Sequence, residues 1–222
     1  TTISGDITID SNDTAANGVG LVLTTVTAGL GSNLAGNGNV FLSTTGAGAN
    51  SITLSAVSAA GDLVRMSSTA AIVDGNDATL NVTSRDLSMT AVTGIATAAN
   101  PLDTAISFLE AQVTTSGGVF IVNNLGLVGV PAGIQRLLTI GSISFNGVPA
   151  ITGVSSAGTA GTDDRIIISN ASPITVTENV TTTDAIIITA LENSDAPVWA
   201  DDLTVKGNVT ISSTGSTVDL RA

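Results

Sequence analysis

The stretch Asn50-Ser51-Ile52-Thr53-Leu54 contains, in five residues, the pattern that decides the fold. A turn-forming residue precedes a short β-branched segment in which apolar and polar side chains alternate, which is typical of a β-strand with one buried face. The pattern recurs along the whole chain, at 5–9, 38–42, 50–54, 78–82, 118–122, 165–168, 185–188, 207–211 and 217–220. The sequence therefore predicts an all-β fold of many short strands.

The spacing of these segments fits two architectures. Several neighbouring starts lie about 10 to 12 residues apart, as in a β-sandwich or in a solenoid with two strands per turn. The tetrapeptide Gly-Val-Pro-Ala occurs at 129–132 and again at 147–150, and the strands share one template, which favours the solenoid. We expect one parallel β-helix domain over 1–222, with a β-sandwich fibre subunit as the alternative. Rungs of about 20 to 24 residues, stacked about 4.8 Å apart, would give roughly ten rungs and a rod about 50 Å long.

The composition describes a folded chain with an aliphatic core. Hydrophobic residues make up 43% of the 222 residues, aromatic residues 2% and charged residues 11%, beside 24 Gly. Disorder would require low hydrophobicity and high charge, so disorder is excluded. A core of Val, Ile, Leu and Ala suits thin stacked layers.

The net charge of -12 bears on possible partners. It repels phosphate backbones and anionic membrane surfaces, so we expect no nucleic-acid partner. The chain has no Cys and therefore no disulfide, and it has no run of about 18 apolar residues that could cross a bilayer. Because the chain begins at Thr1 without a signal-peptide pattern, we interpret it as a mature or excised segment of a longer exported protein.

One segment departs from the strand pattern. Asn100 is a good N-cap, Pro101 suits a first helical position, and four apolar residues follow at helical spacing: Leu102, Ile106, Leu109 and Val113. The spacing predicts a short helix near 101–112.

Several segments resemble a known group of proteins. The segments 98–106, 109–111 and 117–124 resemble parts of filamentous-haemagglutinin-like exoproteins and autotransporter passenger regions, and 207–211 and 217–222 resemble their generic rungs. About half of the chain carries the resemblance. It implies a right-handed β-helix, export across a Gram-negative-type envelope and a place in the shaft of a large surface adhesin or in a surface fibre.

Catalysis has little support in the sequence. The chain contains no His, so His-based triads and His metal ligands are absent. β-Helices do host polysaccharide-cleaving enzymes, and a glycosidase would need two convergent carboxylates. The paired acids are Asp163-Asp164, beside Arg165, and Asp201-Asp202. We expect solvated turn acids rather than an active site, and keep a polysaccharide-active enzyme as a minor alternative.

Acidic turns are better suited to binding calcium than to catalysis, because calcium prefers hard oxygen ligands. The candidate ligands are Asp74, Asn76 and Asp77 in one turn and Asp10 and Asp13 in another. Neither turn completes a calcium-binding repeat, and ordinary Asn/Asp turn chemistry explains both.

Other motifs give weaker evidence of function. The Gly-rich stretch 29–34 lacks a third Gly and a nearby Lys, so a loop is expected. Five sequons, at Asn12, Asn81, Asn170, Asn179 and Asn208, are close to the number that chance would give. Thr-x-Thr at 175–177 and the Thr run 181–183 do not recur as an ice-binding array would. Trp199, the single Trp, is either a contact anchor or a local plug.

These observations predict an extracellular structural or adhesive scaffold without catalysis, whose surface ligand the sequence does not name. Neither end looks like a polar cap, and a solenoid with open ends exposes unpaired strand edges. We therefore expect copies to stack head to tail into fibres. The sandwich alternative would assemble by donating a first strand, near 6–10, to a neighbour.

Overall fold

The computed structural model shows an all-β solenoid. It describes residues 5–14, 19–28, 38–124, 137–145, 151–158, 162–171, 173–191 and 202–222. The strands are β1 (Ile7–Asn12), β2 (Val19–Leu23), β3 (Val26–Ala28), β4 (Val40–Thr45), β5 (Ser51–Leu54), β6 (Val57–Ser68), β7 (Ile72–Asp74), β8 (Val82–Ala91), β9 (Leu102–Ala105), β10 (Phe108–Val113), β11 (Val119–Asn123), β12 (Leu138–Ile140), β13 (Val154–Ser156), β14 (Ile166–Asn170), β15 (Ile174–Val176), β16 (Val180–Thr182), β17 (Ile186–Ala190), β18 (Leu203–Val205), β19 (Ile211–Ser213) and β20 (Val218–Arg221). All of their strand-to-strand pairings are parallel.

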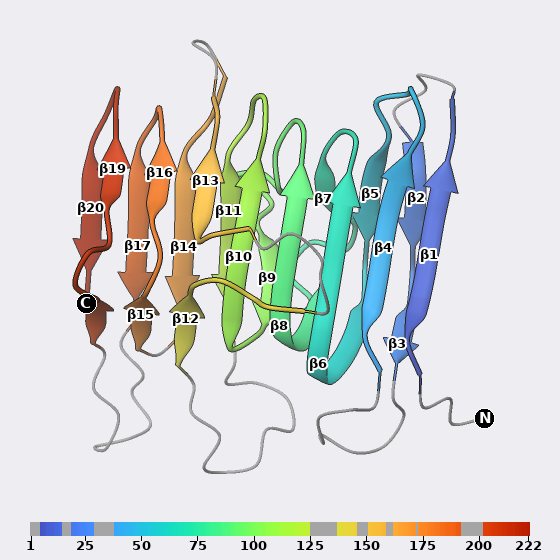
Figure 1. Ribbon diagram of the computed structural model, residues 1–222, viewed down its shortest axis with the longest axis horizontal. Helices are drawn as coiled ribbons and strands as arrows, with labels where there is room; N and C mark the ends of the chain where they lie inside the picture. The colour runs from blue at the N-terminus through green and yellow to red at the C-terminus, as the bar shows by residue number, and fades with distance from the viewer. Residues whose placement is uncertain are drawn as a thin grey trace.

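The strands coil around one axis (Figure 1). The front face contains β1, β4, the second halves of β6 and β8, and β10, followed by the pairs β12–β13, β15–β16 and β18–β19. The back face contains β2, β5, β7, β11, β14, β17 and β20. A third, short side contains β3 and the first halves of β6 and β8, and β9 lies where this side meets the back face, since it pairs with both β8 and β11.

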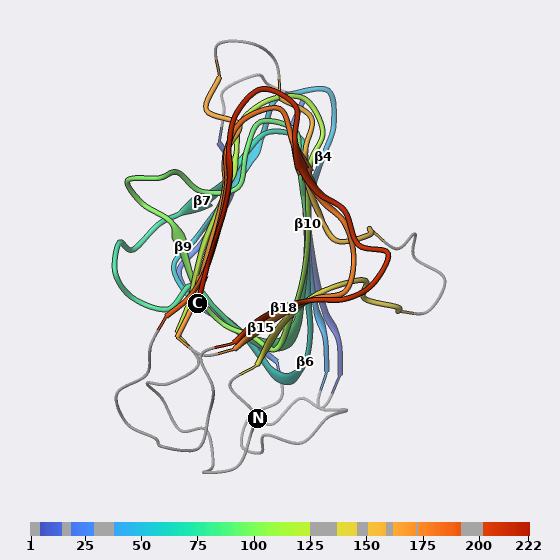
Figure 2. The same ribbon diagram turned by 90° about the vertical axis from the view of Figure 1, so that its left-hand side faces the viewer.

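The coil is right-handed. The chain rises on the front face, crosses over and descends on the back face while it advances from the N-terminal to the C-terminal end, and the view along the axis shows the three-sided section (Figures 1 and 2). The prediction of a right-handed parallel β-helix is confirmed. The alternative of a β-sandwich is wrong, because a sandwich consists of two antiparallel sheets.

The described residues form eight coils, against the roughly ten expected. The central coils have the expected length, since Val64 pairs with Leu87 and Leu87 with Leu109. Other coils are longer: Ile7 pairs with Val40, and Leu138 pairs with Ile174. The difference arises because these longer coils use more residues for each rung.

The helix expected near 101–112 is wrong. This stretch forms β9, a corner at Ile106–Ser107, and most of β10. The inward side chains of the first part are Leu102, Thr104 and Ile106, and those of the second are Leu109, Ala111 and Val113. The corner shifts the alternation by one residue, and this shift makes two strands imitate the three-and-four spacing of a helix.

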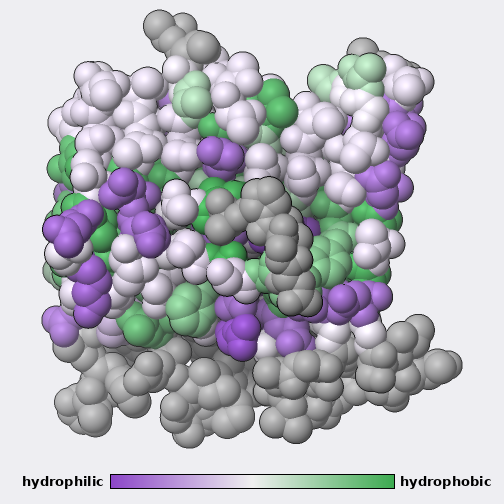
Figure 3. All heavy atoms as spheres, in the orientation of Figure 1, coloured by the Kyte–Doolittle hydropathy of each residue, from purple (hydrophilic) through white to green (hydrophobic). Residues whose placement is uncertain are grey.

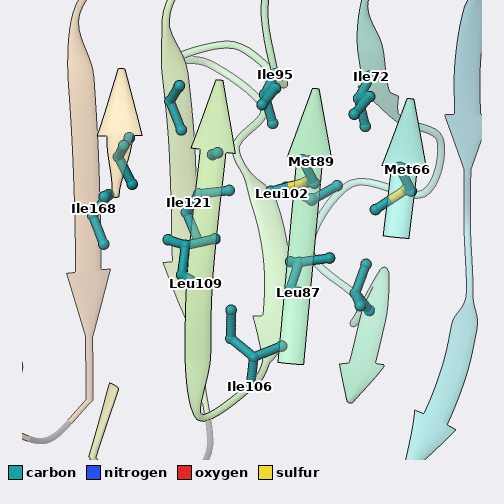
Figure 4. Packing of buried hydrophobic residues seen from close by; sticks show 14 of the residues in the cluster. Met66, Ile72, Leu87, Met89, Ile95, Leu102, Ile106, Leu109, Ile121 and Ile168 are labelled. Carbon is teal, nitrogen blue, oxygen red and sulfur yellow. The ribbon is translucent and has the colours of Figure 1, made fainter. Parts of the chain in front are cut away.

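The core consists of stacked aliphatic columns, one side chain from each coil (Figure 4). One front-face column runs Ile9, Leu42, Met66, Met89, Ala111, Val154, Val180 and Ile211. The columns of the middle coils are almost completely buried. Because each buried apolar side chain contributes about 1.5–3 kcal/mol relative to exposure, these columns supply most of the driving force for coiling.

Buried asparagines close the corners between the faces. Asn123 donates to the carbonyl of Ile106 (3.0 Å) and accepts from the amide of Ile106 (3.0 Å), which satisfies both backbone groups at a corner. Its amide also donates to Oδ1 of Asn170 in the next coil (2.9 Å). Both side chains are fully buried, as are Asn50 and Asn81. The sequons at Asn81 and Asn170 therefore lie inside the folded coil.

Candidate functional site

A polar groove crosses the outer side of the front face. It has a volume of about 610 Å³ and spans β6, β8, β10, β13 and β16. Its lining is mainly hydroxyl and amide side chains with a single charged residue: Arg65, Met66, Ser67, Ser88, Thr90, Gln112, Ile151, Thr152, Ser155, Asn179 and Thr181. Figure 3 views this face, whose upper left part is mainly pale, the colour of residues such as Ser and Thr. The groove can exchange hydrogen bonds with a polar ligand in both directions, since hydroxyls and amides donate and accept.

Parallel pairing places the polar residues of the groove in rows. Ser67, Thr90, Gln112, Ser155 and Thr181 form one row of outward side chains across five coils. The row continues to Asp10 through Ser43, and to Ser212. A parallel sheet holds such a row at the strand spacing, about 4.8 Å per coil, so the floor of the groove is built on rigid elements.

A second row, Arg65, Ser88 and Glu110, lies beside the first. Ser88 Oγ donates to Oε1 of Glu110 (2.6 Å), and Nε of Arg65 donates to Ser88 Oγ (3.3 Å). Glu110 is fully buried although it faces outward, because residues that follow β12 cover it. The backbone amide of Ile143 donates to its Oε2 (2.7 Å). Glu110 thus fixes the segment that forms one wall of the groove.

The two charged side chains of this row, Glu110 and Arg65, differ in how far their hydrogen-bonding groups have partners. Both carboxylate oxygens of Glu110 accept short hydrogen bonds, whereas Nη1 and Nη2 of Arg65 are buried without a hydrogen-bond partner. Nη2 lies 3.7 Å from Oε1 of Glu110, close enough for attraction but too far for a hydrogen bond. Burial raises the pKa of Glu110, and the hydrogen bonds from Ser88 and Ile143 and the charge of Arg65 only partly oppose this.

The described parts of the wall of the groove follow β12, at 141–145, and precede β13, at 151–153. Ser142 and Thr152 pair in an antiparallel bridge at its base, and Ile151 and Thr152 line the groove. Gly153 has a φ of +68°, and a Cβ there would lie 2.1 Å from the carbonyl oxygen of Asn179. Only glycine allows this close approach, which brings the wall against Asn179 on the groove floor.

The C-terminal coil presents a second surface of interest, at the end of the rod. Val218 and Leu220 are 41% and 42% exposed, while Ile186 and Ile188, their partners in the preceding coil, are fully buried. Val205 is 40% exposed in the same way. These side chains continue the core columns, and their next layer is absent among the described residues. Lys206 is exposed beside them.

The first calcium candidate has its acceptors directed at a side-chain amide. Nδ2 of Asn81 donates to Oδ1 of Asp74 (2.5 Å), Oδ1 of Asn76 (2.8 Å) and the carbonyl of Leu54 (3.2 Å). Oδ2 of Asp74 is buried without a partner. Asp77 is exposed, with a φ of 57°, so it takes the left-handed turn position that Asp tolerates. Turn chemistry accounts for this geometry, and calcium binding here stays a prediction.

The second calcium candidate lies on and after β1. Asp10 accepts hydrogen bonds from Ser43 Oγ (2.7 Å) and Thr45 Oγ1 (3.0 Å) in the next coil. The carbonyl of Asp13 accepts from Nδ2 of Asn50 (2.6 Å). Both residues thus tie the first two coils together. Among the described residues there is no group of three or more His, Cys, Asp or Glu placed to hold a metal ion.

The carboxylates of Asp163 and Asp164 have different partners. Asp163 forms a two-pronged ion pair with Arg165 (2.6 and 2.7 Å), which lowers the pKa of the Asp163 carboxyl. Asp164 is buried and accepts from the amide of Gly117 (2.7 Å) and from Thr162 Oγ1 (2.7 Å). One carboxylate is neutralised at the surface and the other caps a turn, so the geometry gives no sign of a cooperating acid and base.

Some expectations fall outside the described residues: the Gly-rich stretch 29–34, both Gly-Val-Pro-Ala copies, Asp201 of the second acidic pair, and Trp199. The Thr-x-Thr motif lies within them. Thr175 aligns with Thr139 in the preceding coil and with Thr204 in the next coil. The positions that align with Thr177 are Gly141 and Lys206, and neither is a Thr. The Thr pairs therefore do not continue from coil to coil.

Sequence reasoning missed the groove. Its floor depends on which residues share a row, and rows are set by coil lengths that the strand template does not reveal. One signal existed, because Arg65, Ser88 and Glu110 follow each other at the rung spacing of 22 to 23 residues.

No family model, curated protein or solved structure matches the chain. Within the described ranges, no helix is long and apolar enough to span a membrane.

Proposed function

We propose that this protein is an extracellular structural scaffold that forms the shaft of a surface adhesin or a fibre, built by adding coils end to end. The exposed core columns of the last described coil are the observation that carries the proposal. Three aliphatic side chains there, Val205, Val218 and Leu220, occupy core columns and are about two-fifths exposed. Exposed apolar surface in a defined geometry marks an interaction site. The extracellular location is supported by the composition and by the resemblance to exported adhesins.

The N-terminal coil offers the matching layer, so the occupant is a second copy of this chain. Ile7 heads the front-face column that ends at Val205, and Ile9 heads the column that ends at Ile211. On the back face, the column headed by Leu21 ends at Val218. Stacking one copy on the next in this register continues these three columns. It also pairs strand edges that would otherwise be open.

Charge complementarity fixes the same register. Lys206 follows Val205, so it lies in the outward row that begins with Thr8. In a stacked copy it faces the gap between Asp6 and Asp10, which flank Thr8 on the outer side of β1. One cation between two carboxylates favours this alignment over a slip by two residues, which would place Lys206 beyond one of them.

The proposal is tested by electron microscopy and sedimentation over a range of protein concentrations. We expect rods of one coil's width that lengthen as concentration rises. Lys206→Glu should shorten them, and adding Asp10→Lys to that variant should restore length, since the pair of charges is exchanged. Rods of unchanged length in Lys206→Glu would refute the register. Monodisperse particles at every concentration would refute stacking itself.

The enzyme alternative has weaker support. The acids that could serve a polysaccharide-cleaving site, Asp163 and Asp164, are engaged with Arg165 and with a turn amide. The net charge of -12 also disfavours nucleic acid as a partner. A scaffold requires a long aliphatic core and a polar, mostly uncharged exterior, and the chain has both.

A further inference from the structure

We propose that the groove on the front face binds an acidic oligosaccharide, with Arg65 receiving a carboxylate of the sugar. The proposal concerns the side of the rod, whereas stacking concerns its ends, so either can fail without the other. It rests on three features: the size and lining of the groove, the unsatisfied donors of Arg65, and the rigidity of the floor.

The lining matches a polyhydroxylated ligand. Six hydroxyl side chains and two amides face a volume of about 610 Å³, well inside the range of about 300–1,000 Å³ typical of ligand sites. A sugar ring presents hydroxyls that donate and accept on several sides, and the side chains of this lining do the same. Ile151 adds an apolar contact for the carbon-bound faces of a ring. A peptide would instead require deep apolar pockets for its side chains.

Arg65 selects an acidic member of this class. Its Nε is engaged by Ser88, but Nη1 and Nη2 lack acceptors, and leaving buried charged donors unpaired is costly. Glu110 does not supply the missing bonds, because its Oε1 lies 3.7 Å from Nη2, beyond hydrogen-bond distance. A ligand carboxylate matches the fork of a guanidinium with two parallel bonds.

The surroundings limit how much charge the ligand carries. Arg65 is the single charged residue in the lining, and the whole chain carries -12. A dense polyanion would be repelled by the rest of the surface, which favours a glycan with isolated carboxylates. The side chain of Arg65 is only 13% exposed and its Nη1 and Nη2 are buried, so the guanidinium must turn toward the groove and the carboxylate must project from the sugar into it.

The floor is preorganised for such a ligand. The residues of the main row, from Ser67 to Thr181, stand on paired parallel strands. The wall is held by the bond from Ile143 to Glu110 and by the close approach at Gly153. Apart from the movement of the Arg65 guanidinium, little ordering is needed on binding, which lowers its cost.

The test uses a tetrasaccharide of alternating glucuronate and N-acetylhexosamine units, and the same tetrasaccharide with its carboxyl groups reduced to alcohols. Titration calorimetry on the wild-type chain should show the acidic form binding about tenfold or more tightly than the neutral form, as expected for a charge-assisted pair. Arg65→Met should abolish this preference and leave both forms bound alike.

Two threonines provide a matched control that leaves the charge in place. Thr181→Val removes a hydroxyl from the groove and should weaken binding about fivefold, the effect of one neutral hydrogen bond. Thr175→Val makes the same change in the same coil outside the groove and should have no effect. Lys206→Glu, which addresses stacking, should also leave the affinity unchanged.

Three results would overturn the proposal: no binding of either tetrasaccharide at millimolar concentration, equal affinity of the wild type for both forms, or equal losses in the two threonine variants. Circular dichroism of each variant identifies any that fails to fold. Should Arg65→Met unfold, the preference of the wild type and the threonine pair still decide the outcome.

Discussion

Replacing Val218 by Asp tests whether the C-terminal coil is an association surface. Val218 is 41% exposed, and its partner in the preceding coil, Ile186, is fully buried. Completing the burial of a valine that is about two-fifths exposed contributes about 1 kcal/mol to stacking, given about 1.5–3 kcal/mol for full burial. An aspartate would lose that contribution and add a desolvation cost of at least about 3 kcal/mol. The total, about 4 kcal/mol, corresponds to an association roughly a thousandfold weaker.

Sedimentation velocity at several concentrations measures this change directly. The matched control is Val73→Asp on β7, because Val73 is 36% exposed on the outer side of a central coil. Both variants add the same charge, but only Val218→Asp places it in a core column at the end of the rod. Equal association of the two variants, or loss of association in both, would refute the reasoning. The free energy of unfolding of the monomer should fall by no more than about 1 kcal/mol in either, as is usual for exposed positions.

Two further predictions concern stability. Asn123→Ala removes the hydrogen-bond partners of the amide and carbonyl of Ile106, and each buried group left unpaired costs about 1–3 kcal/mol. Urea titrations should therefore show a free energy of unfolding lower by about 3–5 kcal/mol. The control Asn124→Ala, one residue along, should lower it by less than about 1 kcal/mol, and comparable losses in the two variants would contradict the role of Asn123 at the corner. Burial raises the pKa of Glu110 above its ordinary 4.5, so the folded protein holds that proton more tightly than the unfolded chain, and this group's contribution to stability falls as pH rises from about 4.5 through the raised pKa. The free energy of unfolding of Glu110→Gln, relative to wild type, should therefore increase with pH over that window, and a difference independent of pH would contradict the burial argument.

The fold followed from the sequence because inward and outward positions differ most clearly in a parallel coil. Segments such as Ile166–Asn170 and Ile186–Ala190 combine β-branched residues with an adjacent turn, and each forms a strand. The segment 101–112 failed because a corner changes the inward parity at Ile106, and local spacing carries no record of a corner. Thr104 and Ala111, small or polar inward residues, also weaken the alternation that would have indicated strands.

The candidate site was harder to predict than the fold because it lies on the outer side of the coil. The second halves of β6 and β8 carry Arg65, Ser88 and other polar residues. These residues interrupt the apolar pattern that indicates a strand, so the two strands were hard to predict from the sequence. A groove also requires knowing that residues 22 to 43 positions apart share a row, and that offset changes between coils.

The distribution of charge and apolar surface gives association a direction. The sides of the rod carry outward carboxylates such as Asp10, Asp77 and Asp103, within a net charge of -12, so two rods side by side repel each other. The C-terminal end exposes aliphatic columns instead, and short-range apolar contact outweighs a repulsion that is screened over about 8–10 Å at physiological salt. Attraction at the ends with repulsion at the sides favours single rods over bundles. It also leaves the front face, with its groove, open to solvent along the length of an assembled rod, which is the arrangement that a scaffold for display requires.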